Sequence, residues 1–84
     1  MTFAVEVQRP AEKELAQLSS EVQQRIARAL LRLADQPYPV GCKKLRGSDG
    51  YRIRVGDYRV LYTVDAAARK VVVSALGHRR EIYR

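Results

Sequence analysis

Three arginines that could bind a phosphodiester lie in two short segments in the second half of the chain. Arg52 and Arg54 alternate with apolar residues, and Arg59 follows in a second alternating segment. Arginine binds phosphate through two parallel hydrogen bonds, so three arginines on one face would favour a phosphate-containing partner. An ordinary solvated face is the competing interpretation, because exposed arginine is common and surface charges contribute little energy.

More basic residues flank these arginines on both sides. They are Lys43, Lys44, Arg46, Arg79 and Arg80. The net charge of the chain is +7, yet the first 40 residues carry five basic and five acidic side chains, so the excess begins at residue 41. This asymmetry predicts a polyanion-binding face for RNA, DNA or an acidic protein. A membrane surface is disfavoured because the basic residues do not follow the spacing of an amphipathic helix.

Proton transfer has two candidate residues near the end of the chain, His78 and Tyr83. A phenol beside several arginines favours its ionised form and can accept a proton, whereas a lone histidine is more often just polar surface. The sequence contains no Ser-His-Asp set and no glycine-rich phosphate loop. With one cysteine, one histidine and scattered acids, it predicts neither a metal site nor a cofactor.

A tight hairpin would bring the three arginines together. Residues 51–55 and 58–64 alternate as half-buried strands do, and Gly56-Asp57 between them suits a two-residue type II′ turn. This turn sets Arg54 directly opposite Arg59, with Cβ atoms about 5 Å apart. Like charges at that distance repel, so the pair is either splayed into solvent or stabilised by a bound anion.

The remaining elements form the scaffold for this hairpin. We expect a strand over residues 2–8, a short helix from Pro10, a second helix capped by Ser19 or Ser20 and ending near Asp35, and a central apolar strand over 70–76. The predicted fold is a single α+β domain, residues 1–84, with an N-terminal strand, a helical hairpin and a mainly antiparallel sheet of three to four strands. We expect no functional site in the first 40 residues. The absence of a long apolar segment or a signal-like N-terminus predicts a cytoplasmic protein.

Three segments carry a resemblance to a known family. Residues 43–47 (KKLRG), 51–62 (YRIRVGDYRVLY) and 76–83 (LGHRREIY) resemble RelE-type toxins of the RelE/ParE toxin-antitoxin superfamily, and the resemblance extends over nearly the whole chain. It implies two helices packed on a mainly antiparallel sheet, and a ribosome-dependent endoribonuclease that cuts mRNA in the ribosomal A site. It also implies a cognate antitoxin as partner.

The resemblance also implies roles for individual residues. The family's functional positions fall on Arg52, Arg54, Arg59, Arg79 and Tyr83. We expect Arg59 and Arg79 to stabilise transition-state charge, Arg52 and Arg54 to orient RNA, and Tyr83 or His78 to transfer the proton. The remaining basic positions would bind RNA or the ribosome: Lys43, Lys44, Arg46 and Arg80. Because arginine keeps its proton, Arg52 and Arg54 cannot act as general bases.

Two alternatives stay open at this point. A toxin of the ParE branch would poison DNA gyrase and cut no RNA, although the arginine and tyrosine set favours the RelE branch. A catalytically inactive RNA-binding module of the same fold is the other alternative. An antitoxin would present an acidic or amphipathic segment to the arginine face, or a helix to the outer positions Ala16, Ala27 and Leu31.

Overall fold

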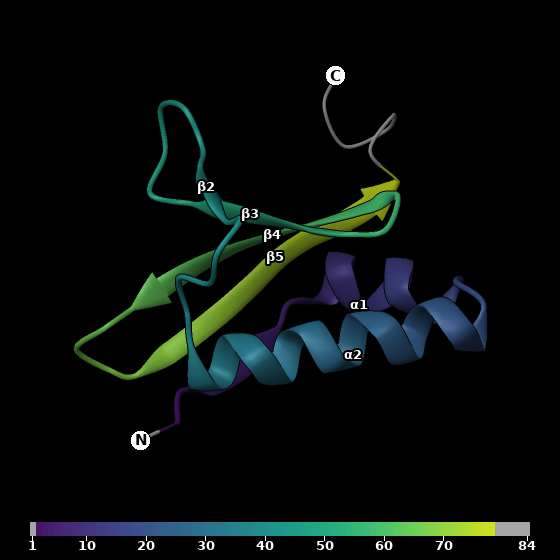
Figure 1. Ribbon diagram of the computed structural model, residues 1–84, viewed down its shortest axis with the longest axis horizontal. Coiled ribbons are helices and arrows are strands. Elements are labelled where there is room, and N and C mark those ends of the chain that lie inside the picture. The colour runs from purple at the N-terminus through teal and green to yellow at the C-terminus, as the bar shows by residue number, and fades with distance from the viewer. Residues whose placement is uncertain (1, 79–84) are drawn as a thin grey trace.

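A five-stranded sheet organises the protein in the computed structural model, which describes residues 2–78 (Figure 1). Its order is β1-β5-β4-β3-β2, and β1 is parallel to β5 while the other neighbours are antiparallel. The strands are β1 (Ala4–Val7), β2 (Lys43–Lys44), β3 (Tyr51–Val55), β4 (Tyr58–Asp65) and β5 (Lys70–His78). This confirms the predicted α+β class, and the apolar run predicted as a central strand is β5, which pairs on both sides.

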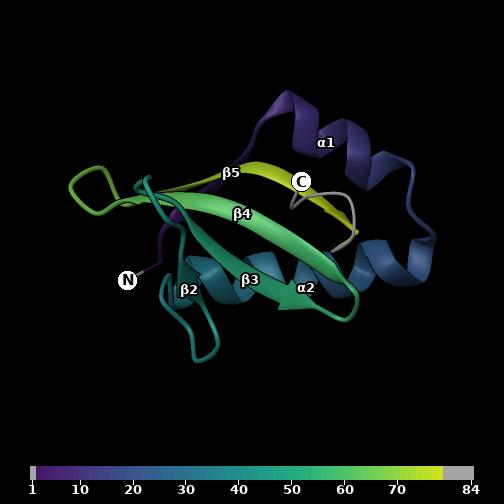
Figure 2. The same ribbon diagram turned by 90° about the horizontal axis from the view of Figure 1, so that it is seen from above.

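Two helices, α1 (Arg9–Ala16) and α2 (Ser20–Asp35), cover one face of the sheet. The first has proline in its opening turn, where the missing N–H costs nothing. The second is capped by Ser19, whose Oγ accepts a hydrogen bond from the Val22 N–H at 3.3 Å. The first turns of both helices confirm the sequence prediction, which began one helix near Pro10 and capped the other with Ser19 or Ser20. Figure 2 looks onto the opposite face, with β3 and β4 in front and α2 passing behind them. Neither described helix combines the length and apolarity needed to span a bilayer.

The core lies between the helices and the sheet. Its fully buried large side chains are Ile26, Leu33, Val60, Tyr62, Val71 and Val73. The Tyr62 hydroxyl donates a buried hydrogen bond of 2.8 Å to the Pro37 carbonyl, which ties the chain leaving α2 to the middle of β4. Burial, reinforced by the neighbouring Cys42 thiol, raises the pKa of the Tyr62 phenol well above its usual range.

The β3–β4 hairpin has the register that the sequence predicts. Val55 pairs with Tyr58, and Arg54 pairs with Arg59. Gly56 has φ +61°, while no positive φ occurs at Asp57, as a type II′ turn requires. Side chains of paired residues point to the same face of a sheet, so Arg54 and Arg59 are direct neighbours.

A bulge in β5 is a feature that the sequence did not predict. Val73 pairs with Tyr62 and Ala75 with Leu61, so Ser74 is the additional residue. Its hydroxyl donates to the Leu61 carbonyl at 3.3 Å. The extra residue reverses which later side chains face the helices: Leu76 enters the core instead of Ala75.

The C-terminal end of β5 and the presence of β2 also differ from the sequence prediction. The predicted apolar strand ended before Gly77, whereas β5 continues through Gly77 and His78, which pair with Arg59 and Tyr58. The two-residue strand β2 was not predicted from the sequence, which marked Lys43 and Lys44 only as basic residues. Both differences arise because backbone pairing with a neighbouring strand extends an element beyond its own apolar pattern.

Candidate nucleic-acid interface

A shallow basic hollow of about 370 Å³ lies over β2, β3 and β4. The residues that line it are Lys43, Lys44, Leu45, Arg46, Arg52 and Arg59. Five of these six are basic and none is acidic, so the structure gathers four predicted binding residues and one predicted catalytic residue around one hollow. Their positive charges add up over a short distance, which favours a polyanion over a neutral ligand.

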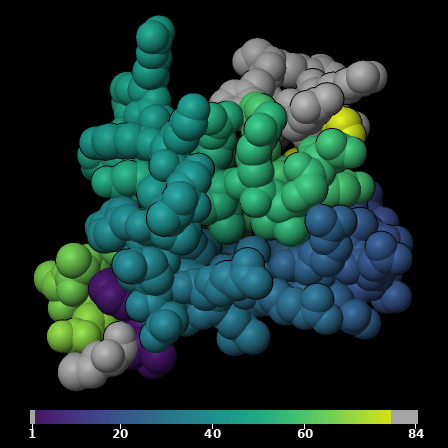
Figure 3. Space-filling model, in the orientation of Figure 1, coloured from purple at the N-terminus to yellow at the C-terminus, as the bar shows by residue number. Residues whose placement is uncertain are grey.

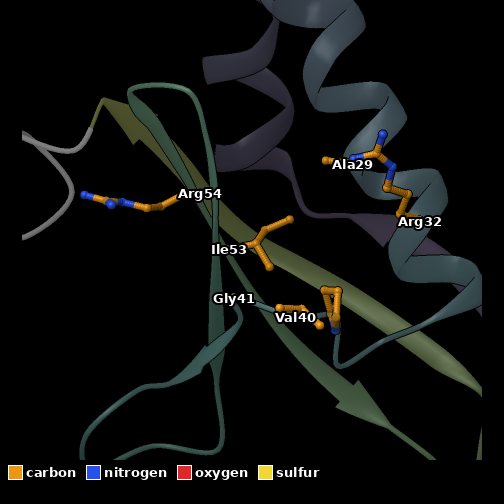
Figure 4. Close-up of a pocket in the computed structure, with 7 residues that line it drawn as sticks. Ala29, Arg32, Val40, Gly41, Ile53 and Arg54 are labelled. Carbon is orange, nitrogen blue, oxygen red and sulfur yellow. The ribbon is translucent and has the colours of Figure 1, made fainter.

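Arg54 and Arg59 form the cross-strand pair beside this hollow. In Figure 4 the side chain of Arg54 leaves β3 on the side opposite Ile53, whose side chain points toward α2. The arginine face is therefore the face of the sheet away from the helices. Arg54 is exposed, whereas Arg59 is half-buried and its Nε is shielded from solvent. A shielded guanidinium interacts more strongly with an anion than an exposed one because less water screens it.

His78 lies on the other face of the sheet. Its cross-strand partner is Tyr58, and the two rings meet edge-on with centroids 5.7 Å apart. Tyr58 packs against the core on the helix side, while Arg59, the next residue along β4, points to the opposite side. His78, one of the two predicted proton-transfer residues, therefore lies on the face of the sheet opposite Arg59, and the Ser74 bulge is the cause. Its catalytic role stays a prediction.

The other predicted residues of the chain end, Arg79, Arg80 and Tyr83, lie outside the described residues. Within residues 2–78 no three His, Cys, Asp or Glu side chains gather in a way that could hold a metal ion.

A second basic surface escaped the sequence prediction. Arg25, Arg28 and Arg32 line a groove between α2 and the end of β3. Their spacing of three and four residues was the available signal, since it places all three on one face of a helix. The equal count of acids and bases in this half of the chain concealed it.

The comparisons with known proteins agree on one family. The family model for the ParE toxin of the type II toxin-antitoxin system parDE matches residues 5–83. A Methanocaldococcus jannaschii chain assigned as the toxin RelE1 is 30% identical over 88 residues, covering 100% of this chain and 98% of the relative.

Solved structures of RelE proteins share the fold. The RelE-RelB complex from Pyrococcus horikoshii aligns with a TM-score of 0.86 and 30% identity, covering 96% of this chain and 99% of that one. The intact RelBE toxin-antitoxin complex from Escherichia coli aligns with a TM-score of 0.79 and 28% identity, covering 90% and 95%. The order of elements, the basic hollow on the helix-free face and these similarities agree, and the chain belongs to the RelE/ParE superfamily of type II toxin-antitoxin toxins.

Proposed function

We propose that this toxin is a ribosome-dependent endoribonuclease that cuts mRNA in the ribosomal A site. The observation that carries the proposal is the basic hollow, in which Arg52 and Arg59 meet basic residues from β2 and the segment after it. The similarity to RelE toxins across the whole chain supports the same activity. The proposal places the protein in the cytoplasm, where translating ribosomes are found.

In the proposed reaction RNA supplies its own nucleophile. The ribose 2′-OH attacks the adjacent phosphorus, so the O2′–P bond forms while the P–O5′ bond breaks. The products are a 2′,3′-cyclic phosphate and a 5′-OH. The protein must align the 2′-OH, accept its proton, return a proton to the leaving oxygen and stabilise charge on the phosphorane-like transition state. The reaction needs no metal-bound water as nucleophile.

The basic residues divide between charge stabilisation and orientation. Arg59 is half-buried and held by β4, so it can stabilise transition-state charge without first reorganising, and we assign Arg79 to the same task. Arg52 and the exposed Arg54 orient the RNA backbone. We assign Lys43, Lys44, Arg46 and Arg80 to binding RNA and the ribosome, and the first three of these line the hollow.

Proton transfer is assigned to Tyr83. Of the two residues considered, His78 has its ring against Tyr58 on the helix side, away from Arg59. A phenol near guanidinium groups has a stabilised phenolate and is a competent proton acceptor.

A cognate antitoxin is the proposed protein partner. The Pyrococcus horikoshii and Escherichia coli relatives are each described in a complex with RelB. For this chain, an acidic antitoxin segment would neutralise the basic hollow and associate rapidly, because opposite charges steer the encounter. An apolar helix face could in addition rest on Leu31, a residue that is 71% exposed.

The test uses toxin purified through its antitoxin, ribosomes and a defined mRNA. Cleavage should yield 2′,3′-cyclic phosphate and 5′-OH ends and require ribosomes. An mRNA with a single 2′-deoxynucleotide at the cut position should resist cleavage, because its nucleophile is missing. Cleavage of the deoxy substrate at an unchanged rate contradicts the mechanism, and tight RNA binding without any cut favours the inactive module.

Inhibition of DNA gyrase is the second candidate function, because the family model that matches is that of ParE. A gyrase supercoiling assay run beside the mRNA assay separates the two. Loss of supercoiling activity with intact mRNA supports the ParE-like function, whereas codon-phased mRNA cuts with unaffected gyrase support the endoribonuclease.

A further inference from the structure

A second basic groove lies between α2 and the end of β3. It has a volume of about 270 Å³ and is lined by Arg25, Arg28 and Arg32 of α2 together with residues 54–56. All three α2 arginines are exposed. Figure 3 shows the outer surface of α2 adjoining the β3–β4 hairpin on one side of the molecule. Because α2 rises 1.5 Å per residue, the row extends for about 10 Å along the helix axis, longer than one phosphate group needs.

The three arginines are not neutralised within the described part of the chain. Glu21 precedes Arg25 by four residues and Asp35 follows Arg32 by three, which are favourable spacings for helical ion pairs. Among residues 2–78 neither acid forms such a pair, and no acidic residue lines the groove.

Arg25 instead lies over the hairpin turn. A Cβ placed on Gly56 would be 3.4 Å from both terminal nitrogens of the Arg25 guanidinium. The missing side chain of Gly56 therefore leaves room for the guanidinium beside the turn.

The groove is distinct from the basic hollow. Ile53 points from β3 toward α2 and Arg54 points the other way, so the α2 row and the hollow lie on opposite sides of β3 (Figure 4). The outer edge of β3 pairs with β2 only at Tyr51 and Arg52, so no strand of the described chain covers the edge at residues 53–55. Two basic surfaces thus flank one open edge.

We infer that the α2 groove binds the phosphodiester backbone of a second RNA segment, one that the enzyme holds but does not cut. The inference rests on the proposed function, because a ribosome-dependent nuclease must dock on structured RNA while it positions mRNA elsewhere. The forked guanidinium favours phosphate, and the extended row suits successive phosphates. An acidic peptide fits less well, since the mostly charged lining offers few apolar contacts for its other side chains.

The test compares two triple variants with the same loss of charge. R25Q/R28Q/R32Q removes the groove charges, and R9Q/K13Q/R69Q removes three exposed charges elsewhere. Binding is measured to purified 70S ribosomes and to a 20-base-pair RNA duplex, over a series of salt concentrations. Circular dichroism and thermal unfolding show whether each variant is folded, and R28E alone provides a milder perturbation.

The groove variant should bind both probes at least about tenfold more weakly at low salt, and its log–log salt slope should fall by about 2–3 relative to the control. In the cleavage assay the loss should appear in KM more than in kcat. Equal RNA binding by the two triple variants overturns the inference. So does a groove variant that loses only antitoxin binding, which would identify an acidic protein as the occupant. If the wild type cuts no mRNA, the proposed function fails, while the duplex comparison still decides the groove.

Discussion

The His78 ring lies edge-on against the Tyr58 ring, with centroids 5.7 Å apart and an interplanar angle of 79°. Tyr58 packs on the core, so this contact holds the imidazole on the helix side of the sheet, while Gly77 is the residue that lies opposite Arg59. The glycine puts no side chain beside the Arg59 guanidinium.

This contact predicts that the imidazole contributes little to proton transfer. Tyr83→Phe should lower the cleavage rate by about 10²–10⁴-fold, the usual loss when a general acid or base is removed. His78→Phe keeps a ring against Tyr58 and should change the rate far less. Single-turnover cleavage of ribosome-bound mRNA measures both. A comparable loss in His78→Phe, with a shifted pH profile, would place the imidazole in the reaction.

Arg59 should act on the chemical step. Arg59→Ala should reduce kcat by about 10²–10³-fold, as removal of one preorganised transition-state donor does. Arg59→Lys should recover only part of this loss, because an ammonium cannot make the forked phosphate contact. Arg9→Ala, which removes an equal charge from the start of α1, is the matched control. An Arg59→Ala enzyme with normal kcat and raised KM would assign Arg59 to binding instead.

Lys43 and Lys44 should contribute to binding through charge. Replacing both with glutamine should weaken RNA binding at low salt and reduce the log–log salt slope by about 1–2, since each lysine displaces roughly one counterion from the RNA. The expected kcat is unaltered at saturating ribosome concentration. Filter binding across a salt series measures the slope, and an unchanged slope would exclude phosphate contacts by this pair.

The Arg54–Arg59 pair should cost stability in the free protein. Arg54→Gln should raise the free energy of unfolding by about 0.2–1 kcal/mol at low ionic strength, because it removes a like-charge cross-strand contact. The gain should vanish at high salt, where the repulsion is screened. Arg54→Lys retains the charge and should show no gain. Urea unfolding at two salt concentrations measures the effect, and a salt-independent gain would point to strand propensity instead.

Tyr62 should make stability depend on alkaline pH. Its pKa is raised above the usual value of 10, so the folded state holds the phenolic proton more tightly than the unfolded chain. The contribution of this proton to the free energy of unfolding is complete below about pH 10 and is lost as the pH rises further. Tyr62→Phe should remove the part of the alkaline loss of stability that the Tyr62 phenol causes. It should also destabilise the protein by about 1–3 kcal/mol at neutral pH, because the buried Pro37 carbonyl loses its donor.

Tyr58→Phe is the control for this experiment, since the Tyr58 hydroxyl makes no hydrogen bond among residues 2–78. Urea unfolding from pH 7 to pH 11 gives both quantities. If Tyr62→Phe unfolds like the wild type at every pH, the hydrogen bond to Pro37 contributes nothing to stability.

The sequence alone determined the hairpin and its arginine face. A two-residue turn at Gly56-Asp57 leaves one register for two alternating strands, so the opposition of Arg54 and Arg59 follows from local chemistry. The Ser19 cap and the end of α2 near Asp35 were likewise predictable, because caps and apolar periodicity act within a few residues.

Only the tertiary structure decided on which face of the sheet His78 lies. It also decided that Arg25 of α2 lies beside the hairpin turn at Gly56. The apolar run of β5 has no strict alternation, so nothing in it marks Ser74 as a bulge; pairing with Leu61 and Tyr62 of β4 makes that choice. Arg25 meets Gly56 across 31 positions of chain because the core packs α2 beneath β3. Contacts between residues so far apart depend on how whole elements pack, which charge counts and periodicity do not encode.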